Sequence, residues 1–206
     1  MKERIFCIDH YIDAEISITN GSKLKVILSH GSNNDMNYSL ISKLFESMSK
    51  EYSVLRFNFS YVSNRLEKDE LTNKREIEAC IERMGNENIV LIGKSYGGIL
   101  SLSIASEGKY DIRKVIVLGY PLHEYKNSKR IFDNEAAIKF NDKTTFIIGD
   151  NDPNCELSLF NKLIPNANTK IIENSDHSYR PVDGSGSLDK NEDRVVELVC
   201  SELNIL

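Results

Sequence analysis

An alternating hydrophobic pattern opens the chain. From residue 11 to residue 18 every second position is apolar, which is the period of a strand with one solvent-facing side. The dipeptide Asn20-Gly21 follows, and both residues tolerate the positive φ angles of a tight hairpin turn. We therefore expect an N-terminal antiparallel hairpin in which residues 24–29 return beside the first strand.

Short, continuous apolar runs replace this pattern further along the chain. Such runs are typical of strands in a parallel sheet that helices cover on both faces. They comprise residues 26–28, 54–57, 89–92, 115–118, 145–148 and 170–172.

Helical spacing appears between and after these runs, with apolar side chains three, four and seven or eight positions apart on one face. These side chains are Ile41, Leu44, Phe45 and Met48 in one segment, Ile77, Cys80, Ile81 and Met84 in a second, and Val195, Leu198, Val199 and Leu203 near the end. Residues 96–106 are apolar nearly all round and predict a buried central helix. The alternation predicts a three-layer α/β fold with a mostly parallel central sheet and helices on both faces.

Length and charge narrow the classes of protein. The 206 residues suit one domain, residues 1–206. The net charge of -5 arises from 31 acidic and 26 basic residues scattered along the chain, so no basic stripe is present to bind nucleic acid. No apolar run approaches the roughly 20 residues that cross a bilayer, and residues 1–6 lack the regions of a signal peptide. We expect a cytoplasmic protein that binds neither nucleic acid nor membranes.

The four cysteines give no metal or redox motif. Cys7, Cys80, Cys155 and Cys200 lie far apart and form no C-x-x-C pair. We expect reduced thiols, and the spacing alone leaves a disulfide open.

The segment Gly93-Lys94-Ser95-Tyr96-Gly97 follows an apolar run and precedes the expected buried helix. This is the G-x-S-x-G pattern in a strand-turn-helix context, and it predicts Ser95 as an exposed nucleophile. A β-carbon at Gly93 or Gly97 would collide with neighbouring backbone in so tight a turn. The alternative is that the glycines only join a strand to a helix that Ser95 caps. A Ser-Lys pair with Lys94 is disfavoured because adjacent side chains diverge at a sharp turn.

A serine nucleophile needs a base, and the chain has four histidines, His10, His30, His123 and His177. His177 lies in a polar loop directly after the last apolar run, where a side chain can reach the carboxyl edge of the sheet. We expect His10 to be a solvated loop residue and His123 to be structural. His177 is the predicted base.

The imidazole in turn needs an acid that fixes its tautomer. Asp150 and Asp152 both follow the run at residues 145–148 and precede His177, which gives the chain order Ser, Asp, His. We favour Asp152, because it sits further into the loop and Pro153 restricts its backbone to extended conformations. Asp150 remains the alternative, with binding of a backbone N–H as its other role.

A calcium loop is the competing interpretation of the same segment. Cys155 and Asn161 stand where an EF-hand needs its glycine and its bidentate glutamate. We therefore expect no metal site, and no cofactor.

Acyl transfer also needs two backbone N–H groups that face the developing oxyanion. Tyr96, directly after the nucleophile, is expected to supply one. The loop that follows His30-Gly31 is expected to supply the other from Ser32, unless this loop is only a strand-to-helix turn.

Six segments give the chain a family resemblance. They are Leu28-Ser29-His30-Gly31, Arg56-Phe57-Asn58-Phe59, Gly93-Lys94-Ser95-Tyr96-Gly97-Gly98, Gly119-Tyr120-Pro121-Leu122-His123, Asp152-Pro153 and Asp176-His177. In this order they resemble the dienelactone-hydrolase-like α/β-hydrolases, and among these the hydrolases related to testis-expressed protein 30 and to the KAT8 regulatory complex subunit 3. The resemblance implies the α/β-hydrolase fold, with Ser95, Asp152 and His177 at the triad positions. The chain departs from the family at Tyr96, where methionine is common, and after Gly31, where further glycines are often found.

These interpretations predict a serine hydrolase that cleaves a small carboxylic ester or thioester, its small-molecule acyl substrate, through an acyl-enzyme intermediate. The connection between residues 118 and 144 is short, so we expect no large lid. The alternative is a catalytically silent scaffold or binding protein with the same fold, because the resembling branch also includes a member that looks like a scaffold subunit.

Overall fold

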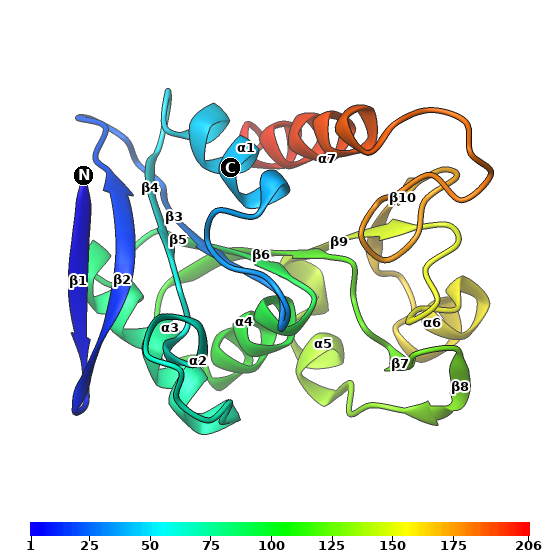
Figure 1. Cartoon of the computed structure of the whole chain (residues 1–206), viewed down its shortest axis with the longest axis horizontal. Helices are drawn as coiled ribbons and strands as arrows, with labels where there is room; N and C mark the ends of the chain where they lie inside the picture. The colour runs from blue at the N-terminus through cyan, green and yellow to red at the C-terminus, as the bar shows by residue number, and fades with distance from the viewer.

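A twisted eight-stranded sheet forms the centre of the molecule in the computed structural model, which describes all 206 residues (Figure 1). The strand order is β1-β2-β4-β3-β5-β6-β9-β10. Six neighbouring strands run parallel, namely β4, β3, β5, β6, β9 and β10. The strands β1 and β2 add an antiparallel edge. Their bounds are Lys2–Cys7 (β1), His10–Ser17 (β2), Lys25–Ser29 (β3), Ser53–Phe57 (β4), Ile89–Lys94 (β5), Ile112–Leu118 (β6), Thr144–Gly149 (β9) and Asn168–Ile172 (β10).

Helices cover both faces of this sheet. On one face lie α1 (Ser39–Met48) and α7 (Leu188–Leu203), and on the other α3 (Glu70–Met84), α4 (Tyr96–Glu107) and α5 (Glu135–Lys139). Shorter elements are α2 (Ser60–Ser63), the hairpin of β7 (His123–Glu124) and β8 (Asn127–Ile131), the 3-10 turn η1 (Asn141–Lys143) and α6 (Leu157–Leu163). This arrangement confirms the predicted fold class. None of the helices combines the length and hydrophobicity needed to cross a bilayer.

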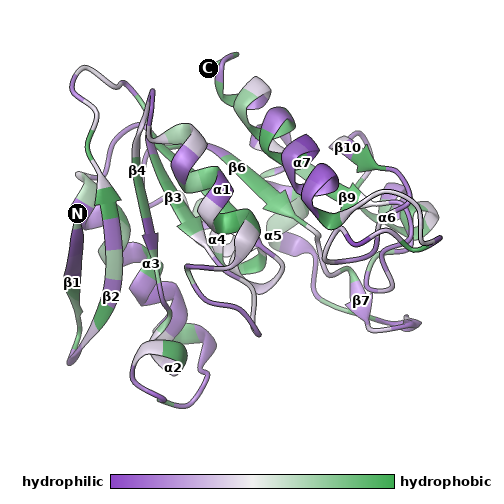
Figure 2. Ribbon diagram, turned by 45° about the horizontal axis from the view of Figure 1, so that its top comes forward, coloured by the Kyte–Doolittle hydropathy of each residue, from purple (hydrophilic) through white to green (hydrophobic).

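Two hydrophobic cores follow from the two covered faces. The larger holds 29 buried residues, including those of α3 and α4, and the smaller holds 19, including those of α1 and α7. Every residue of β5 is buried, whereas on β2 the buried residues Ile12, Ala14 and Ile16 alternate with more accessible ones. Figure 2 shows the hydrophobic colour along β3 and β6 and a mixture of both colours along α7. The segments with continuous apolar runs and the segment with the alternating pattern therefore all form strands, as predicted.

The hairpin is N-terminal and antiparallel as predicted, but the predicted pairing of its strands is wrong. β2 pairs with β1, with Ile12 opposite Ile5, and β4 separates β2 from β3. Gly21 does adopt the positive φ of a turn, 80°. β3, whose central residues 26–28 are apolar, is however buried between two parallel neighbours, while the half-exposed β2 lies near the edge. A strand without a solvent-facing side is more stable inside the sheet.

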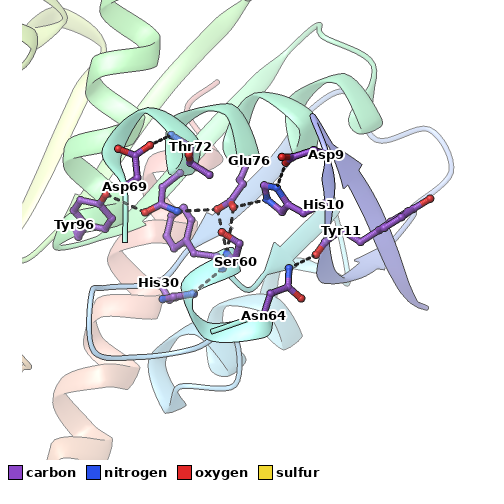
Figure 3. A network of polar contacts seen from close by, with 12 residues as sticks. Asp9, His10, Tyr11, His30, Ser60, Asn64, Asp69, Thr72, Glu76 and Tyr96 are labelled. Atoms are coloured by element: carbon purple, nitrogen blue, oxygen red, sulfur yellow. Dashed lines mark hydrogen bonds and ion pairs between the residues drawn. The ribbon is translucent and has the colours of Figure 1, made fainter. Parts of the chain in front are cut away.

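A buried polar network ties this hairpin to α3 and to the start of α4 (Figure 3). The Glu76 carboxylate, fully buried, accepts hydrogen bonds from the backbone N–H of Ser60 at 3.3 Å and from the Asn73 amide at 3.0 Å. His10 Nε2 lies 2.8 Å from the same carboxylate, and the Tyr96 hydroxyl donates to Asn73 at 3.1 Å. The expectation that His10 is a solvated loop residue is therefore wrong: it belongs to β2 and faces the Glu76 carboxylate.

Glu76→Ala should lower the free energy of unfolding by about 3–5 kcal/mol, because it leaves the buried Asn73 amide and Ser60 N–H without their acceptor and removes the buried partner of His10. Denaturant unfolding followed by circular dichroism measures the change. Glu82→Ala, on the exposed side of the same helix, is the matched control and should stay within about 1 kcal/mol. Equal effects of the two substitutions would show that the network contributes nothing to stability.

Candidate active site

Ser95 occupies the single residue between β5 and α4. Its backbone has φ 51° and ψ -112°, a conformation that non-glycine residues rarely adopt and that is kept where the surroundings enforce it. A β-carbon on Gly93 would lie 2.4 Å from the carbonyl carbon of Gly97, and one on Gly97 would lie 2.8 Å from the carbonyl oxygen of His30. The predicted collisions at both glycines are thus confirmed.

Side chains from three strand ends meet at this turn. Ser95 follows β5, Asp152 follows β9 and His177 follows β10. The Ser95 hydroxyl lies 3.0 Å from His177 Nε2, and His177 Nδ1 lies 2.7 Å from Asp152 Oδ2. With the proton on Nδ1, the imidazole donates to Asp152 and accepts from the Ser95 hydroxyl. The structure therefore brings together the three residues that the sequence singled out.

Asp150 has a different partner. Its carboxylate accepts from the backbone N–H of Ser175 at 2.9 Å and from the Asn151 amide at 2.8 Å. Partial burial opposes ionisation, but these hydrogen bonds outweigh it and lower the pKa of Asp150. Of the two aspartates, only Asp152 contacts His177, and Asp150 holds the loop that precedes it.

Hydrogen bonds fix the loop that carries His177. The Asp176 carboxylate accepts from the backbone N–H groups of Ser178 at 2.7 Å and Arg180 at 2.9 Å. Tyr179 is fully buried, and its hydroxyl donates to the carbonyl of Ile147 in β9 at 2.8 Å. The loop is thus tied internally and to the sheet, which positions the imidazole.

Lys94 reaches this loop from the end of β5. Its side chain is buried, and Nζ donates to the carbonyl oxygen of His177 at 2.7 Å. This contact agrees with the expectation that Lys94 points away from Ser95. No sequence pattern connects Lys94 with His177. The available signal was that Lys94 is the only charged residue of an otherwise apolar strand.

Burial and neighbouring charge shift the pKa values of Lys94 and His177. Burial lowers the pKa of Lys94 to about 8. Burial also lowers the pKa of His177, and the Lys94 charge lowers it further against the opposing effect of Asp152. The imidazole is therefore held neutral near pH 7, the state in which it can accept a proton.

The two residues expected to supply oxyanion donors, Tyr96 and Ser32, belong to different parts of the fold. Tyr96 is the first residue of α4, so its N–H belongs to the turn that lacks intrahelical acceptors. Ser32 lines the same cleft as Ser95 and His177, and its hydroxyl accepts from Lys68 Nζ at 2.7 Å.

The remaining two histidines serve the fold. His30 is buried, with Nδ1 2.8 Å from the carbonyl oxygen of Gly31 and Nε2 accepting from the N–H of Phe59 at 3.2 Å. Burial lowers the pKa of His30 to about 4. His123 is also buried, and its Nε2 accepts from the N–H of Glu156 at 3.0 Å. His30 supports the loop of Ser32, and His123 has the structural role that was expected.

A cleft of about 510 Å³ opens over Ser95 and His177. Tyr125, in the turn of the β7–β8 hairpin, is the only hydrophobic residue among the 11 that line it. The segment between β6 and β9 forms only this hairpin, α5 and η1.

The strand order and the sharp strand-helix turn define an α/β hydrolase. The sequence model described as "Alpha/beta hydrolase domain" matches residues 22–203, and the chain belongs to this family. No curated protein is a significant sequence match.

Solved structures of the same fold cover nearly the whole chain. An α/β serine hydrolase homologue from Coxiella burnetii is 16% identical with a TM-score of 0.74, covering 98% of this chain and 97% of its own. A putative α/β hydrolase from Agrobacterium tumefaciens is 14% identical with a TM-score of 0.77, covering 99% and 97%. Est1E from Butyrivibrio proteoclasticus is 16% identical with a TM-score of 0.70, covering 98% and 99%.

Lys94→Met should change the pH dependence of stability. Unfolded lysine keeps its proton up to the ordinary pKa of 10.5, whereas folded Lys94 releases it at a pKa of about 8. Between these values the unfolded chain binds more protons, so the wild type gains stability relative to the variant as the pH rises. Urea unfolding from pH 7 to pH 10.5 measures this difference. The control Lys129→Met, on the exposed strand β8, should show no such trend, and a pH-independent difference for Lys94→Met would contradict the assignment.

Proposed function

We propose that the protein is a serine hydrolase that cleaves a small carboxylic ester or thioester through a Ser-His-Asp triad. The hydrogen-bonded chain from Ser95 through His177 to Asp152 carries this proposal. The Ser95–His177 contact is short enough for proton transfer, and the His177–Asp152 contact holds the imidazole. The serine stands in the strained turn between strand and helix.

The proposed reaction has two halves. Ser95 Oγ attacks the carbonyl carbon of the substrate while its proton passes to His177 Nε2. The C–O or C–S bond then breaks, and His177 gives this proton to the leaving alcohol or thiol. Water attacks the acyl-enzyme, His177 takes a proton from the water, and Ser95 regains it as the acid leaves.

Four residues assist these steps in the proposal. The Asp152 carboxylate keeps the proton on His177 Nδ1 and stabilises the imidazolium. The N–H groups of Tyr96 and Ser32 face the oxyanion. Lys94 acts as a positioning residue, because it holds the carbonyl oxygen of His177 and its charge favours the neutral imidazole.

Similar structures support an ester as the substrate class. Est1E has a structure with bound ferulic acid, and a thermophilic enzyme from Thermogutta terrifontis is described as an esterase. The motif order further supports a place near the dienelactone-hydrolase-like group. Tyr125 is the only hydrophobic residue that lines the cleft, which favours short acyl groups over long aliphatic ones.

The purified protein should react covalently with a fluorophosphonate probe, because an activated serine attacks the phosphorus without a need for the natural substrate. Ser95→Ala should abolish labelling while circular dichroism shows an intact fold. Ser101→Ala, at a buried serine within α4, is the matched control and should still be labelled if folded. Absence of labelling of the wild type from pH 6 to pH 9 would favour the silent scaffold.

Asp152→Ala should reduce kcat by up to about 10⁴-fold with little change in KM, because His177 loses the partner that fixes its tautomer. Asp150→Ala loosens the loop at Ser175 and should reduce kcat less. Steady-state kinetics on 4-nitrophenyl acetate measures both variants. A larger loss of kcat for Asp150→Ala would contradict the assignment of Asp152 and would make Asp150 the residue that orients His177.

A further inference from the structure

One lysine contacts both of the residues that are expected to supply the oxyanion donors. Lys68 lies in the loop of residues 64–69, between α2 and α3. Its Nζ donates to the Ser32 hydroxyl at 2.7 Å and lies 3.9 Å from the centre of the Tyr96 ring. Lys68 therefore links the loop that follows β3 to the first residue of α4.

The ammonium of Lys68 has no competing partner. No carboxylate lies within ion-pair distance of Nζ, and its one hydrogen bond is the bond to Ser32. Partial burial lowers the pKa of Lys68, which is the direction expected for an ammonium without a nearby opposite charge. The face of the Tyr96 ring attracts this cation. The two contacts of Lys68 therefore both lead to the proposed oxyanion hole.

Ser32 carries a free donor, and Lys68 supplies its only hydrogen bond. The Ser32 N–H has no acceptor within the protein, as an oxyanion donor requires. The peptide plane that contains this N–H also contains the carbonyl of Gly31, which accepts from His30 Nδ1 at 2.8 Å. That bond holds the Gly31 side of the plane. On the Ser32 side, the bond from Lys68 to the hydroxyl is the only hydrogen bond.

Tyr96 gives Lys68 a fixed support. Its hydroxyl donates to the Asn73 side chain at 3.1 Å, and Asn73 is fully buried and bonded to the Glu76 carboxylate (Figure 3). The Tyr96 ring is therefore tied to α3 as well as to α4. Because Tyr96 directly follows Ser95 in the chain, an ammonium on its ring is also held in place relative to the nucleophile.

We propose that Lys68 is a positioning residue, which keeps the Ser32 N–H directed at the oxyanion through its contacts with the Ser32 hydroxyl and the Tyr96 ring. The inference rests on the proposed serine hydrolase function and adds a residue to it. The negative charge on the substrate oxygen develops only as the reaction proceeds, so a poorly held donor lowers kcat and leaves KM nearly unchanged.

Lys68→Met removes the ammonium and keeps much of the length of the side chain. On 4-nitrophenyl acetate kcat should fall about 10-fold, less than the 10²- to 10³-fold that complete loss of an oxyanion donor costs, and KM should stay within about twofold. Lys68→Arg should restore most of kcat, because a guanidinium can also donate to Ser32 and stack on Tyr96. Glu67→Met, at an exposed neighbour in the same loop, is the matched control and should change neither constant.

Ser32→Ala tests the contact from its other side, because it removes the hydroxyl that Lys68 binds and keeps the N–H. It should lower kcat by a factor similar to that of Lys68→Met. The double variant should lose no more than either single variant, since each substitution breaks the same contact. Circular dichroism checks that all variants are folded.

An unchanged kcat in Lys68→Met, or losses that multiply in the double variant, would overturn the positioning role. A raised KM at unchanged kcat would also overturn it, because Lys68 would then bind the substrate directly. In each of these cases ester hydrolysis and fluorophosphonate labelling by the wild type leave the proposed function standing. A wild type that neither hydrolyses the ester nor reacts with the probe overturns both proposals together.

Discussion

The close approach of β5 and α4 is the constraint on which the site depends. Without side chains at Gly93 and Gly97 the two backbones come into contact, and Ser95 is left in a strained conformation at the turn. Strain of this kind persists only where the surroundings over-determine the geometry. Here the surroundings are rigid, because β5 is buried along its whole length and α4 packs against both α3 and α5. The larger hydrophobic core therefore stabilises the strained turn that holds the half-buried Ser95.

The loop of His177 is held by a different kind of interaction. Apart from Tyr179 it contributes little apolar surface to the cores, so hydrogen bonds decide its position. Asp150 binds its beginning, Asp176 closes it internally and Lys94 holds its central carbonyl. Each bond connects the loop either to itself or to a strand end, and therefore to the sheet that also positions Ser95. Hydrophobic packing therefore fixes the position of Ser95, and hydrogen bonds fix the position of His177.

Local pattern was sufficient to predict most of the fold. The apolar runs became strands and the helical spacings became helices, because each pattern is decided by burial within a few residues. The error concerned the partner of β2. Asn20-Gly21 is a turn signal wherever it occurs, but the position of β3 depends on its neighbours β4 and β5, which are distant in sequence. The sequence pattern did not identify β1, whose exposed edge alternates weakly.

In the candidate site, too, local sequence features could be predicted and contacts between distant residues could not. Ser95, His177 and Asp152 could be proposed from the sequence because the proposed chemistry demands residue types directly after strands, which a sequence displays. The contact between Glu76 and His10 was not predicted, and His10 was misassigned to a solvated loop, because the two residues are 66 positions apart in the sequence. Lys94 was visible as an unusual residue, but its contact with His177 spans 83 positions. Buried polar pairs are specified by tertiary structure, and no short pattern encodes them.

The charges around His177 act in opposite directions. Asp152 stabilises the imidazolium, while burial and Lys94 destabilise it. Asp152 alone would raise the pKa of His177, which would disfavour the neutral imidazole that a general base needs. Because Lys94 binds a backbone carbonyl of the same residue, its charge is fixed relative to the ring. The resting imidazole therefore stays neutral. In the proposed mechanism, Asp152 stabilises the imidazolium that forms when His177 takes the proton of Ser95.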